Sequence, residues 1–209
     1  MELTKTELKL LKSLNTPKKI QDYLDKLGIN FDYKKDTFRS PREVIRTGKC
    51  HCIEGATFAA LALSLNGYKP LLVHLKTTKH DYEHVIAVFK KNGKLGAITK
   101  TNHAVLRYRE PVYKNIRELV MSFFHEYFLD SGKKTLRSYS VPVNLSRFNK
   151  KNWQTDKKDL WYIDSYLDKV KHYDILNKKQ IADLRKADKI EIMAGKLVEW
   201  KPGGKKIFK

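Results

Sequence analysis

The segment KCHCIEGATFAALAL, residues 49–63, is the stretch of sequence that decides the fold. It places Cys52 where a long apolar run begins, which predicts a buried helix with the cysteine at its N-terminus. A thiol in that position lies at the positive end of the helix dipole, beside backbone N–H groups that have no helical partner. Both features favour the thiolate, the form of cysteine that attacks carbonyl carbons.

A second candidate residue, His84, opens the apolar run His84–Phe89 further along the chain. A cysteine at a helix start and a histidine at a later strand start are a usual way to build a Cys–His nucleophile pair. A histidine at a strand start is often only a satisfied or solvent-facing residue, so its functional interpretation depends on the candidate nucleophile. Among the other histidines, His103 beside Asn102 is the reserve candidate.

The composition is that of a globular protein with an unusually basic surface. The 209 residues are 41% hydrophobic and carry a formal net charge of +20, and a chain of this length can bury a substantial core. Of the 43 basic residues 34 are lysines, and they are spread along the whole chain instead of one arm or helix face. Surfaces that read phosphates or bases tend to use arginine forks with interleaved aromatics. The sequence therefore favours a solvated lysine coat over a nucleic-acid site, with attraction for anionic partners at low salt.

Cysteine content and hydropathy bear on the compartment. The two cysteines, Cys50 and Cys52, are separated by one residue, and a disulfide across so short a span would be strained. No apolar run approaches the ~18 residues of a membrane-spanning helix, and residues 1–14 lack the cleavage site of a signal peptide. We therefore expect a cytoplasmic protein that does not enter a membrane.

Hydrophobic periodicity, together with N-cap, proline and glycine residues, predicts the helices and strands. Thr16-Pro17 and Ser40-Pro41 each pair an N-cap with a proline at the first helical position, and Gly28 ends the first of these helices. Helices followed by strands and then helices favour an α+β fold with an antiparallel sheet. We expect helices over 16–27, 41–46, 52–66, 111–128, 160–170 and 178–184, strands over 70–76, 84–90, 95–99 and 104–109, a short strand or hairpin within 191–200, a loop over 29–39 and a mobile tail at 202–206.

Several motifs resemble one known superfamily. The segment GKCHCIEGA (48–56), its alanine-rich helix, a strand and then His84 resemble the transglutaminase-like superfamily, which has a papain-like cysteine fold. The stretches CIEGA (52–56), GAITKTN (96–102) and LRYREPVY (106–113) are similar to an uncharacterised bacterial group within it. The resemblance covers about residues 40–128.

This resemblance implies an architecture and two roles. Cys52 is expected to be the nucleophile and His84 the general base, with the cysteine helix packed on an antiparallel sheet and no cofactor or metal required. Residues 1–148 are expected to form this core with its N-terminal helices. Residues 149–209 are expected to be a helical C-terminal extension packed on the core as part of the same domain.

The third catalytic position departs from the superfamily pattern. The superfamily usually places an aspartate on the strand after the histidine strand, and that register falls here on Thr99. No Asp or Glu occurs between His84 and Glu110. We expect Asn102 to hold the imidazole, as asparagine does in papain-like proteases, with Thr99 as a weaker substitute.

Three classes of function remain open from sequence. The leading hypothesis is a cysteine-dependent acyl-transfer or hydrolytic enzyme acting on a peptide or amide substrate, because protease, amidase and transglutaminase share the same first half-reaction. The second is a catalytically inactive binding scaffold with the same fold. The third is a zinc-binding protein, whose ligands are expected to be Cys50, Cys52, His80 and His84.

Overall fold

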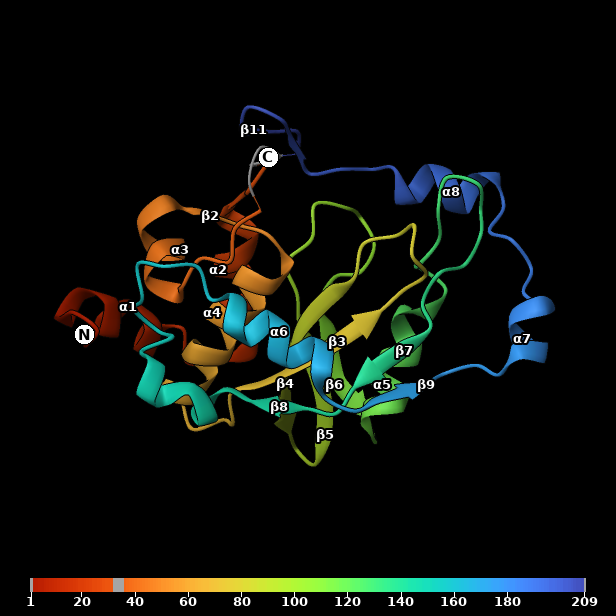
Figure 1. Cartoon of the computed structure of the whole chain (residues 1–209). Helices are drawn as coiled ribbons and strands as arrows, with labels where there is room; N and C mark the ends of the chain where they lie inside the picture. The colour runs from red at the N-terminus through yellow and green to blue at the C-terminus, as the bar shows by residue number, and fades with distance from the viewer. Residues whose placement is uncertain (1, 32–35, 209) are drawn as a thin grey trace.

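A seven-stranded antiparallel sheet forms the centre of the computed structural model, which describes residues 2–31 and 36–208 (Figure 1). The strand order is β6-β5-β4-β3-β7-β9, and the short β8 also pairs with β3. The predicted α+β class with an antiparallel sheet is therefore confirmed. The strands are β3 (Leu71–Lys76), β4 (His84–Lys91), β5 (Lys94–Ile98), β6 (Arg109–Tyr113), β7 (Ser138–Ser140), β8 (Val143–Asn144) and β9 (His172–Asp174).

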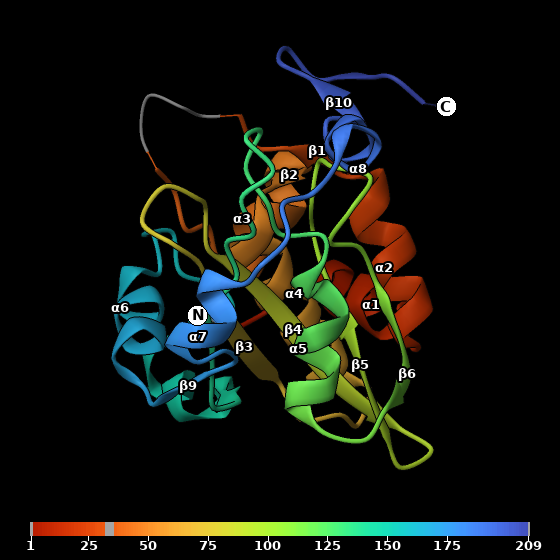
Figure 2. The same cartoon turned by 90° about the vertical axis from the view of Figure 1, so that its right-hand side faces the viewer.

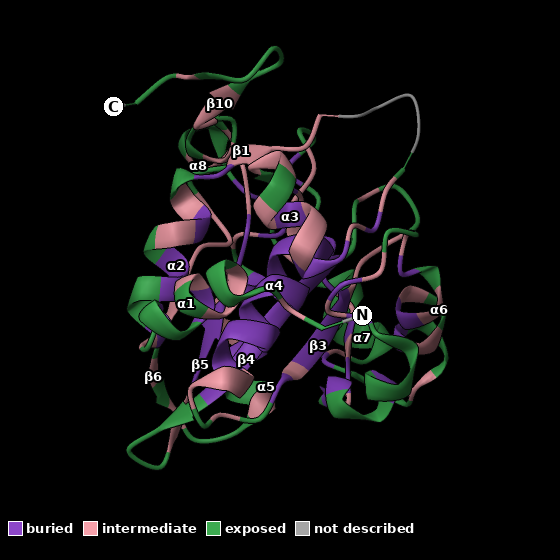
Figure 3. Cartoon of the chain, turned by 90° about the vertical axis from the view of Figure 1, so that its left-hand side faces the viewer, coloured by how far each residue is buried: buried purple, intermediate pink, exposed green. Residues whose placement is uncertain are grey.

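Helices cover both faces of this sheet (Figure 2). Helix α4 (Cys52–Leu65) lies on one face and is buried along nearly its whole length, as its purple ribbon shows in Figure 3. Helix α5 (Ile116–Phe124) lies on the other face. The remaining helices are α1 (Lys5–Ser13), α2 (Pro17–Lys26), α3 (Pro41–Thr47), the 3-10 helix η1 (Leu145–Lys151), α6 (Trp161–Lys169), α7 (Lys178–Ala182) and α8 (Lys189–Gly195).

Strand β4 is buried on both faces because apolar side chains occupy both sets of alternating positions. Val85, Ala87 and Phe89 belong to the apolar core under α4. Ile86 and Val88 belong to the second apolar core under α5. Two short strand pairs lie outside the central sheet, the parallel pair β1 (Gly28–Ile29) with β2 (Lys49–Cys50) and the antiparallel pair β10 (Trp200–Lys201) with β11 (Lys205–Lys206).

The capping signals read from the sequence are confirmed. The Thr16 hydroxyl accepts a hydrogen bond from the Lys19 N–H at the start of α2. Ser40 caps α3, which ends at Gly48 in a left-handed conformation with φ of 63°. Such a φ is favourable for glycine, which lacks a Cβ, so the chain can turn there and enter the cysteine helix.

The segment between β5 and α5 differs from the prediction. Residues 104–108 form a loop instead of a strand, and the strand β6 occupies residues 109–113, where we expected the start of a long helix. Pro111 is tolerated because β6 is the edge strand of the sheet. The helix itself begins only after the Asn115 N-cap and ends at Phe124.

The two ends of the chain hold more regular structure than predicted. Helix α1 has a capping box between Thr4 and Glu7 that we did not assign. Half of the range 191–200 belongs to helix α8, which Asp188 caps, and the strand expected within this range is limited to Trp200, the first residue of β10. The hairpin lies later, and its second strand, β11, falls in the tail predicted to be mobile.

Residues beyond 148 share the core of the N-terminal region. Trp153, Leu160, Ile163 and Leu167 are buried in the same apolar cluster as the residues of α4. No interruption of the core coincides with residue 148. Within the described ranges, no helix combines the length and the apolar character needed to cross a bilayer.

Candidate active site

Cys52 is the first residue of α4, and its neighbour His51 is the N-cap. The helix start packs closely against the chain that leaves β5: a Cβ added to Gly55 would lie 2.6 Å from the Lys100 Cβ. Gly55, three residues after the cysteine, has no side chain and therefore permits this close packing.

A buried carboxylate fixes the backbone at this helix start. Glu54 is fully buried and accepts hydrogen bonds from the Arg39 N–H at 2.9 Å, the Thr37 hydroxyl at 2.7 Å and the His51 N–H at 3.0 Å. These donors satisfy the charge, as a buried carboxylate requires. They also tie the segment before α3 to the cysteine helix and keep Glu54 directed away from the cleft.

His84 is the first residue of β4, and only 6% of it is exposed. It lines a cleft of about 310 Å³ together with Cys52, Tyr127 and Lys100. A larger hollow of about 490 Å³ lies beside α1 and the end of α4, but neither cysteine nor histidine lines it. The cleft is therefore the place where the predicted nucleophile and base can meet a substrate.

The Cys52 thiol is strongly acidified. Burial alone raises its pKa, but hydrogen bonds from His51 and His84, together with their charges, outweigh burial and hold the pKa well below its usual value of 9.0. The structure thus brings both predicted residues together. The lowered pKa of Cys52 favours the thiolate, the reactive form of the side chain.

His51 is a partner of the thiolate that the sequence analysis did not identify. Burial disfavours its charged form, yet the hydrogen bond to Cys52 and the charges of Cys52 and Glu54 raise its pKa to about 9. Its Nε2 donates to the Thr37 carbonyl at 2.6 Å, which leaves Nδ1 for the sulfur. The only sequence signal was its place directly before the cysteine, at the helix N-cap.

Cys50 lies close by in the chain but has the opposite chemistry. It is fully buried, and burial raises the pKa of its thiol to about 12. Its sulfur faces the inner side of α4 near Gly55 instead of the cleft. Only one of the two cysteines is therefore prepared to react.

The predicted third residue is not placed on the imidazole. The Asn102 amide exchanges two hydrogen bonds with the backbone of Trp200, at 2.8 and 3.0 Å. The Thr99 hydroxyl donates to the Leu106 carbonyl at 2.8 Å. Nε2 of His84 is buried and has no hydrogen-bond partner among the described residues, so both expected contacts are wrong.

Sheet register explains this difference. Ala87 lies opposite Ile98, the last residue of β5. Continued for three more residues, this register would bring Thr101 opposite His84, instead of Thr99 or Asn102. Thr101 lines the cleft, while its hydroxyl accepts from the His103 N–H. Asn102 lies beyond this point, where the chain has turned towards the C-terminal segment.

The cleft wall contains a further polar group that the sequence did not reveal. The Tyr127 hydroxyl is buried with no hydrogen-bond partner in the described part of the chain. Burial, and next the charge of nearby Cys52, raise the pKa of Tyr127 well above its usual value. Tyr127 therefore stays neutral, and it lines the same cleft as Cys52.

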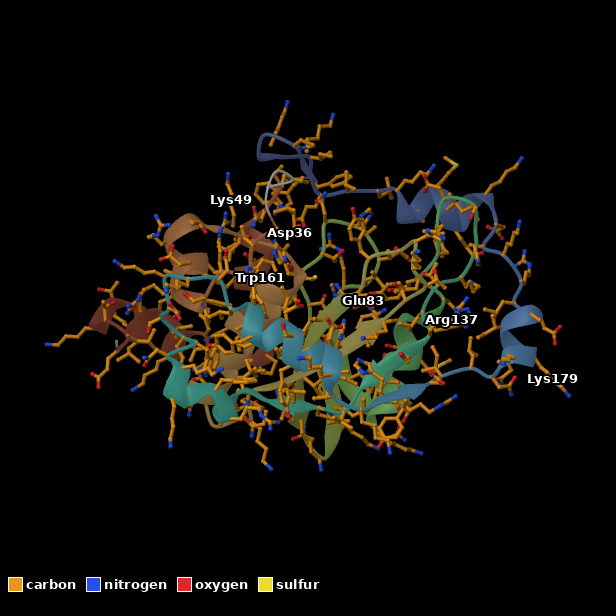
Figure 4. All side chains as sticks on the ribbon, viewed as in Figure 1. Asp36, Lys49, Glu83, Arg137, Trp161 and Lys179 are labelled. Atoms are coloured by element: carbon orange, nitrogen blue, oxygen red, sulfur yellow. The ribbon has the colours of Figure 1, made fainter. Side chains whose placement is uncertain are left out.

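The C-terminal segment borders the cleft from the opposite side. Ile192, Gly195 and Lys196 of α8 and its end line the cleft, and the His103 ring bonds the Gly195 carbonyl at 2.8 Å. Figure 1 shows this segment running along the edge of the molecule above the sheet, and Figure 4 labels Glu83, directly before β4, near the centre of the same view. The cleft thus has a wall contributed by the last residues of the chain.

The zinc ligands considered from sequence are not assembled. Cys50 is enclosed behind the helix start and His80 is exposed on a turn. Within the part of the chain that is described, the one group of three metal-ligating side chains with close donor atoms is His74, Glu83 and Asp168. That alternative therefore has no support in the geometry.

Neither a protein-family model nor a curated protein matches this chain. Its function is therefore inferred from the chemistry of the cleft.

Proposed function

We propose that this protein is a cysteine-dependent acyl-transfer or hydrolytic enzyme of the transglutaminase-like superfamily, acting on a peptide or amide bond. The observation that supports it most is the acidified Cys52 thiol, held between two histidines at a helix N-terminus and open to a cleft. A structural cysteine gains nothing from such acidification, whereas a nucleophile requires it.

The positions of the two histidines suggest different roles. His84 lines the cleft with Cys52, whereas His51 lies behind the thiol, bonded to the Thr37 carbonyl. We assign His84 as the group that passes protons to and from the substrate. His51 is assigned as the cation that keeps the sulfur ionised.

The reaction follows from these roles. The Cys52 thiolate attacks the substrate carbonyl, and the tetrahedral oxyanion is stabilised by backbone N–H groups at the start of α4 and by the Tyr127 hydroxyl. Collapse breaks the C–N bond, the leaving amine takes a proton from the His84 imidazolium, and a thioester remains. Water or an amine then attacks the thioester, gives its proton to His84 and releases Cys52 as thiolate.

One observation favours an inactive binding scaffold as the second candidate. No carboxylate or amide orients the His84 ring, since its Nε2 is without a partner in the described chain. Loss of the orienting residue costs a serine protease about 10⁴-fold in rate. The experiment must therefore separate an active enzyme from a retained fold.

A peptide bearing an electrophile in place of the scissile amide tests the proposal. Mass spectrometry should find one adduct on Cys52, absent in Cys52→Ala and retained in Cys50→Ala, and formed more slowly in His84→Ala. Glutamine peptides with and without hydroxylamine then distinguish transfer from hydrolysis. Equal, slow modification of both cysteines would leave the scaffold as the better reading.

A further inference from the structure

A histidine on β3 has an unused buried nitrogen outside the cleft. The His74 side chain is 6% exposed, and its Nε2 lies 2.7 Å from a Glu83 carboxylate oxygen. That contact places a proton on Nε2 and the lone pair on Nδ1. Nδ1 has no hydrogen-bond partner among the described residues and lies 4.0 Å from Asp168 Oδ1.

A second histidine with one ring nitrogen unpartnered among the described residues lies on β9, which is separated from β3 by β7. His172, the first residue of β9, lies with its ring centroid 5.4 Å from that of His74. Its Nδ1 donates to the Val170 carbonyl at 2.8 Å, so the lone pair lies on Nε2. That Nε2 is also buried and is unpartnered in the described ranges.

We propose that His74 and Asp168, two members of the closely spaced group His74, Glu83 and Asp168, bind a divalent metal ion of the zinc type together with His172, whose ring turns towards them from beside that of His74 when the ion binds, while Glu83 holds His74 in the ligating tautomer. Two imidazole nitrogens and a carboxylate oxygen suit zinc, whose bonds to such ligands measure about 2.0–2.2 Å. An ion between His74 Nδ1 and Asp168 Oδ1, which lie 4.0 Å apart, gives the buried nitrogen the partner that it lacks among the described residues. A carboxylate on the far nitrogen of a metal-bound histidine is a frequent supporting contact.

One neighbouring group opposes the ion. The Lys76 ammonium lies 3.0 Å from Asp168 Oδ1 and competes for that oxygen. Asp168 is half exposed on its side chain, so the carboxylate can turn towards the imidazoles. The metal ion and the Lys76 ammonium therefore compete for Asp168, so removing the lysine charge should raise the affinity for the metal ion.

Calorimetric titration of Zn²⁺ into chelator-treated Cys52→Ser protein tests the site. The serine removes the Cys52 thiolate, which could itself bind zinc at a different place. The result is therefore independent of the proposed enzymatic function. We expect about one equivalent of zinc and a rise in melting temperature. His172→Gln should weaken binding ~10–100-fold, and Lys76→Met should tighten it, while His125→Gln at the exposed end of α5 should change nothing.

Folding of the variants is checked by their far-ultraviolet circular dichroism and their melting temperature without metal. His74→Gln retains a hydrogen-bonding side chain on β3. The Lys76 side chain is 29% exposed, and Lys76→Met offers a variant that tightens binding instead of abolishing it. The assignment fails if Zn²⁺ neither binds nor stabilises the protein. It fails equally if His172→Gln and Lys76→Met leave the affinity unchanged.

Discussion

Cys50 and Cys52 carry the same chemical group, but the pKa of Cys50 is raised and the pKa of Cys52 is lowered. At Cys50 burial is dominant and raises the pKa to about 12. At Cys52 burial is outweighed by the two imidazoles, so the pKa is well below 9.0. One residue of separation, at the turn from β2 into α4, therefore separates an inert thiol from a reactive one.

This contrast predicts the pH dependence of alkylation. Between pH 6 and pH 8 the thiolate fraction of a thiol of ordinary pKa rises by roughly 100-fold. Because the pKa of Cys52 is lowered, iodoacetamide should modify Cys52 with a shallower pH dependence over this range, and it should leave native Cys50 unmodified. Peptide mapping after timed quenching measures both rates. His51→Ala should restore a steep pH dependence, and a steep dependence already in the parent protein would contradict the thiolate assignment.

His51 also links the ion pair to stability. Its pKa in the folded state, about 9, lies above the ordinary 6.5. Protonated His51 therefore stabilises the fold fully below pH 6.5, and this contribution is lost as the pH rises through 9. The protonation state of His51 therefore affects both the stability of the fold and the pKa of the Cys52 thiol.

Tyr127→Phe separates catalysis from folding. The Tyr127 hydroxyl is buried without a partner in the described chain, so removing it should leave stability unchanged or raise it by about 1 kcal/mol. If the hydroxyl stabilises the oxyanion, kcat/KM should fall ~10²-fold while KM changes little. Urea unfolding and steady-state kinetics measure the two effects, and unchanged kcat would remove Tyr127 from the mechanism.

Sequence reasoning identified Cys52 and His84 because each carries a local signal, an apolar run starting at the residue. His51 was missed because its tautomer depends on a carbonyl at Thr37, which only the fold brings near. Asn102 was wrong because register, set by the pairing of β4 with β5, is a property of two segments together. Residue types can be read locally, whereas their partners cannot.

At the scale of elements, the start of α4 packs closely against the segment after β5 because Gly55 has no side chain. Gly55→Ala should destabilise the protein by about 1–3 kcal/mol, because the added Cβ meets the Lys100 Cβ, although alanine favours helices by about 1 kcal/mol. Chemical unfolding measures the loss. Ser64→Ala, near the other end of α4, is the control, and stabilisation by Gly55→Ala would contradict the packing described here.

The N-terminal helices are joined by a largely buried ion pair. Arg42 on α3 contacts both oxygens of Glu7 on α1 at 2.8 Å, and these hydrogen bonds lower the pKa of Glu7 to about 2. The ionised carboxylate stabilises the fold above pH 4.5, and this contribution is lost as the pH falls through 2. The link between α1 and α3 is therefore sensitive to acid.

Glu7→Gln should cost about 1.5–3 kcal/mol at pH 7, the usual range for hydrogen bonds to charged groups, and much less at pH 2. Urea titrations at the two pH values measure the difference. Glu43→Gln breaks the pair with Arg46, whose side chain is 69% exposed, and should cost less than about 1 kcal/mol. Equal losses for the two variants at pH 7 would contradict the burial argument.

Elements with strong caps or long periodicity were predictable, and those fixed by pairing were not. Helices α2 and α4 and strands β3–β5 were confirmed from turn residues and periodicity. Strand β6 was read as helix because Pro111 and Val112 adjoin a true helical pattern, and only the open edge beside β5 makes them a strand.

At the scale of the whole molecule, the C-terminal segment completes the cleft. The backbone of Trp200 is bonded to Asn102, and Glu199 pairs with Arg107 at 3.2 Å. Lys206 Nζ reaches the Asp25 carbonyl of α2 at 3.3 Å. The last residues of the chain are thereby attached to the loop that follows β5 and to the N-terminal layer.

Deletion of residues 188–209 should widen the cleft, because Ile192, Gly195 and Lys196 line it. A bulky maleimide should then modify Cys52 faster relative to iodoacetamide than in the full chain. Comparing the two reagents in each protein corrects for a general change in thiol reactivity. A ratio unchanged by the deletion would show that this wall does not restrict access.

Lys100 connects helix α2 to helix α4, so that the two helices are expected to unfold together. Lys100 is 2% exposed, and its ammonium donates to the Leu24 and Leu27 carbonyls at 2.7 Å each, at the end of α2. Its Cβ lies against Gly55. If α2 detached, the Lys100 ammonium would lose its two carbonyl acceptors while remaining in the interior beside α4, which is unfavourable. Local fraying is thus suppressed, and amide hydrogens of α2 and α4 should exchange with deuterium as one cooperative unit.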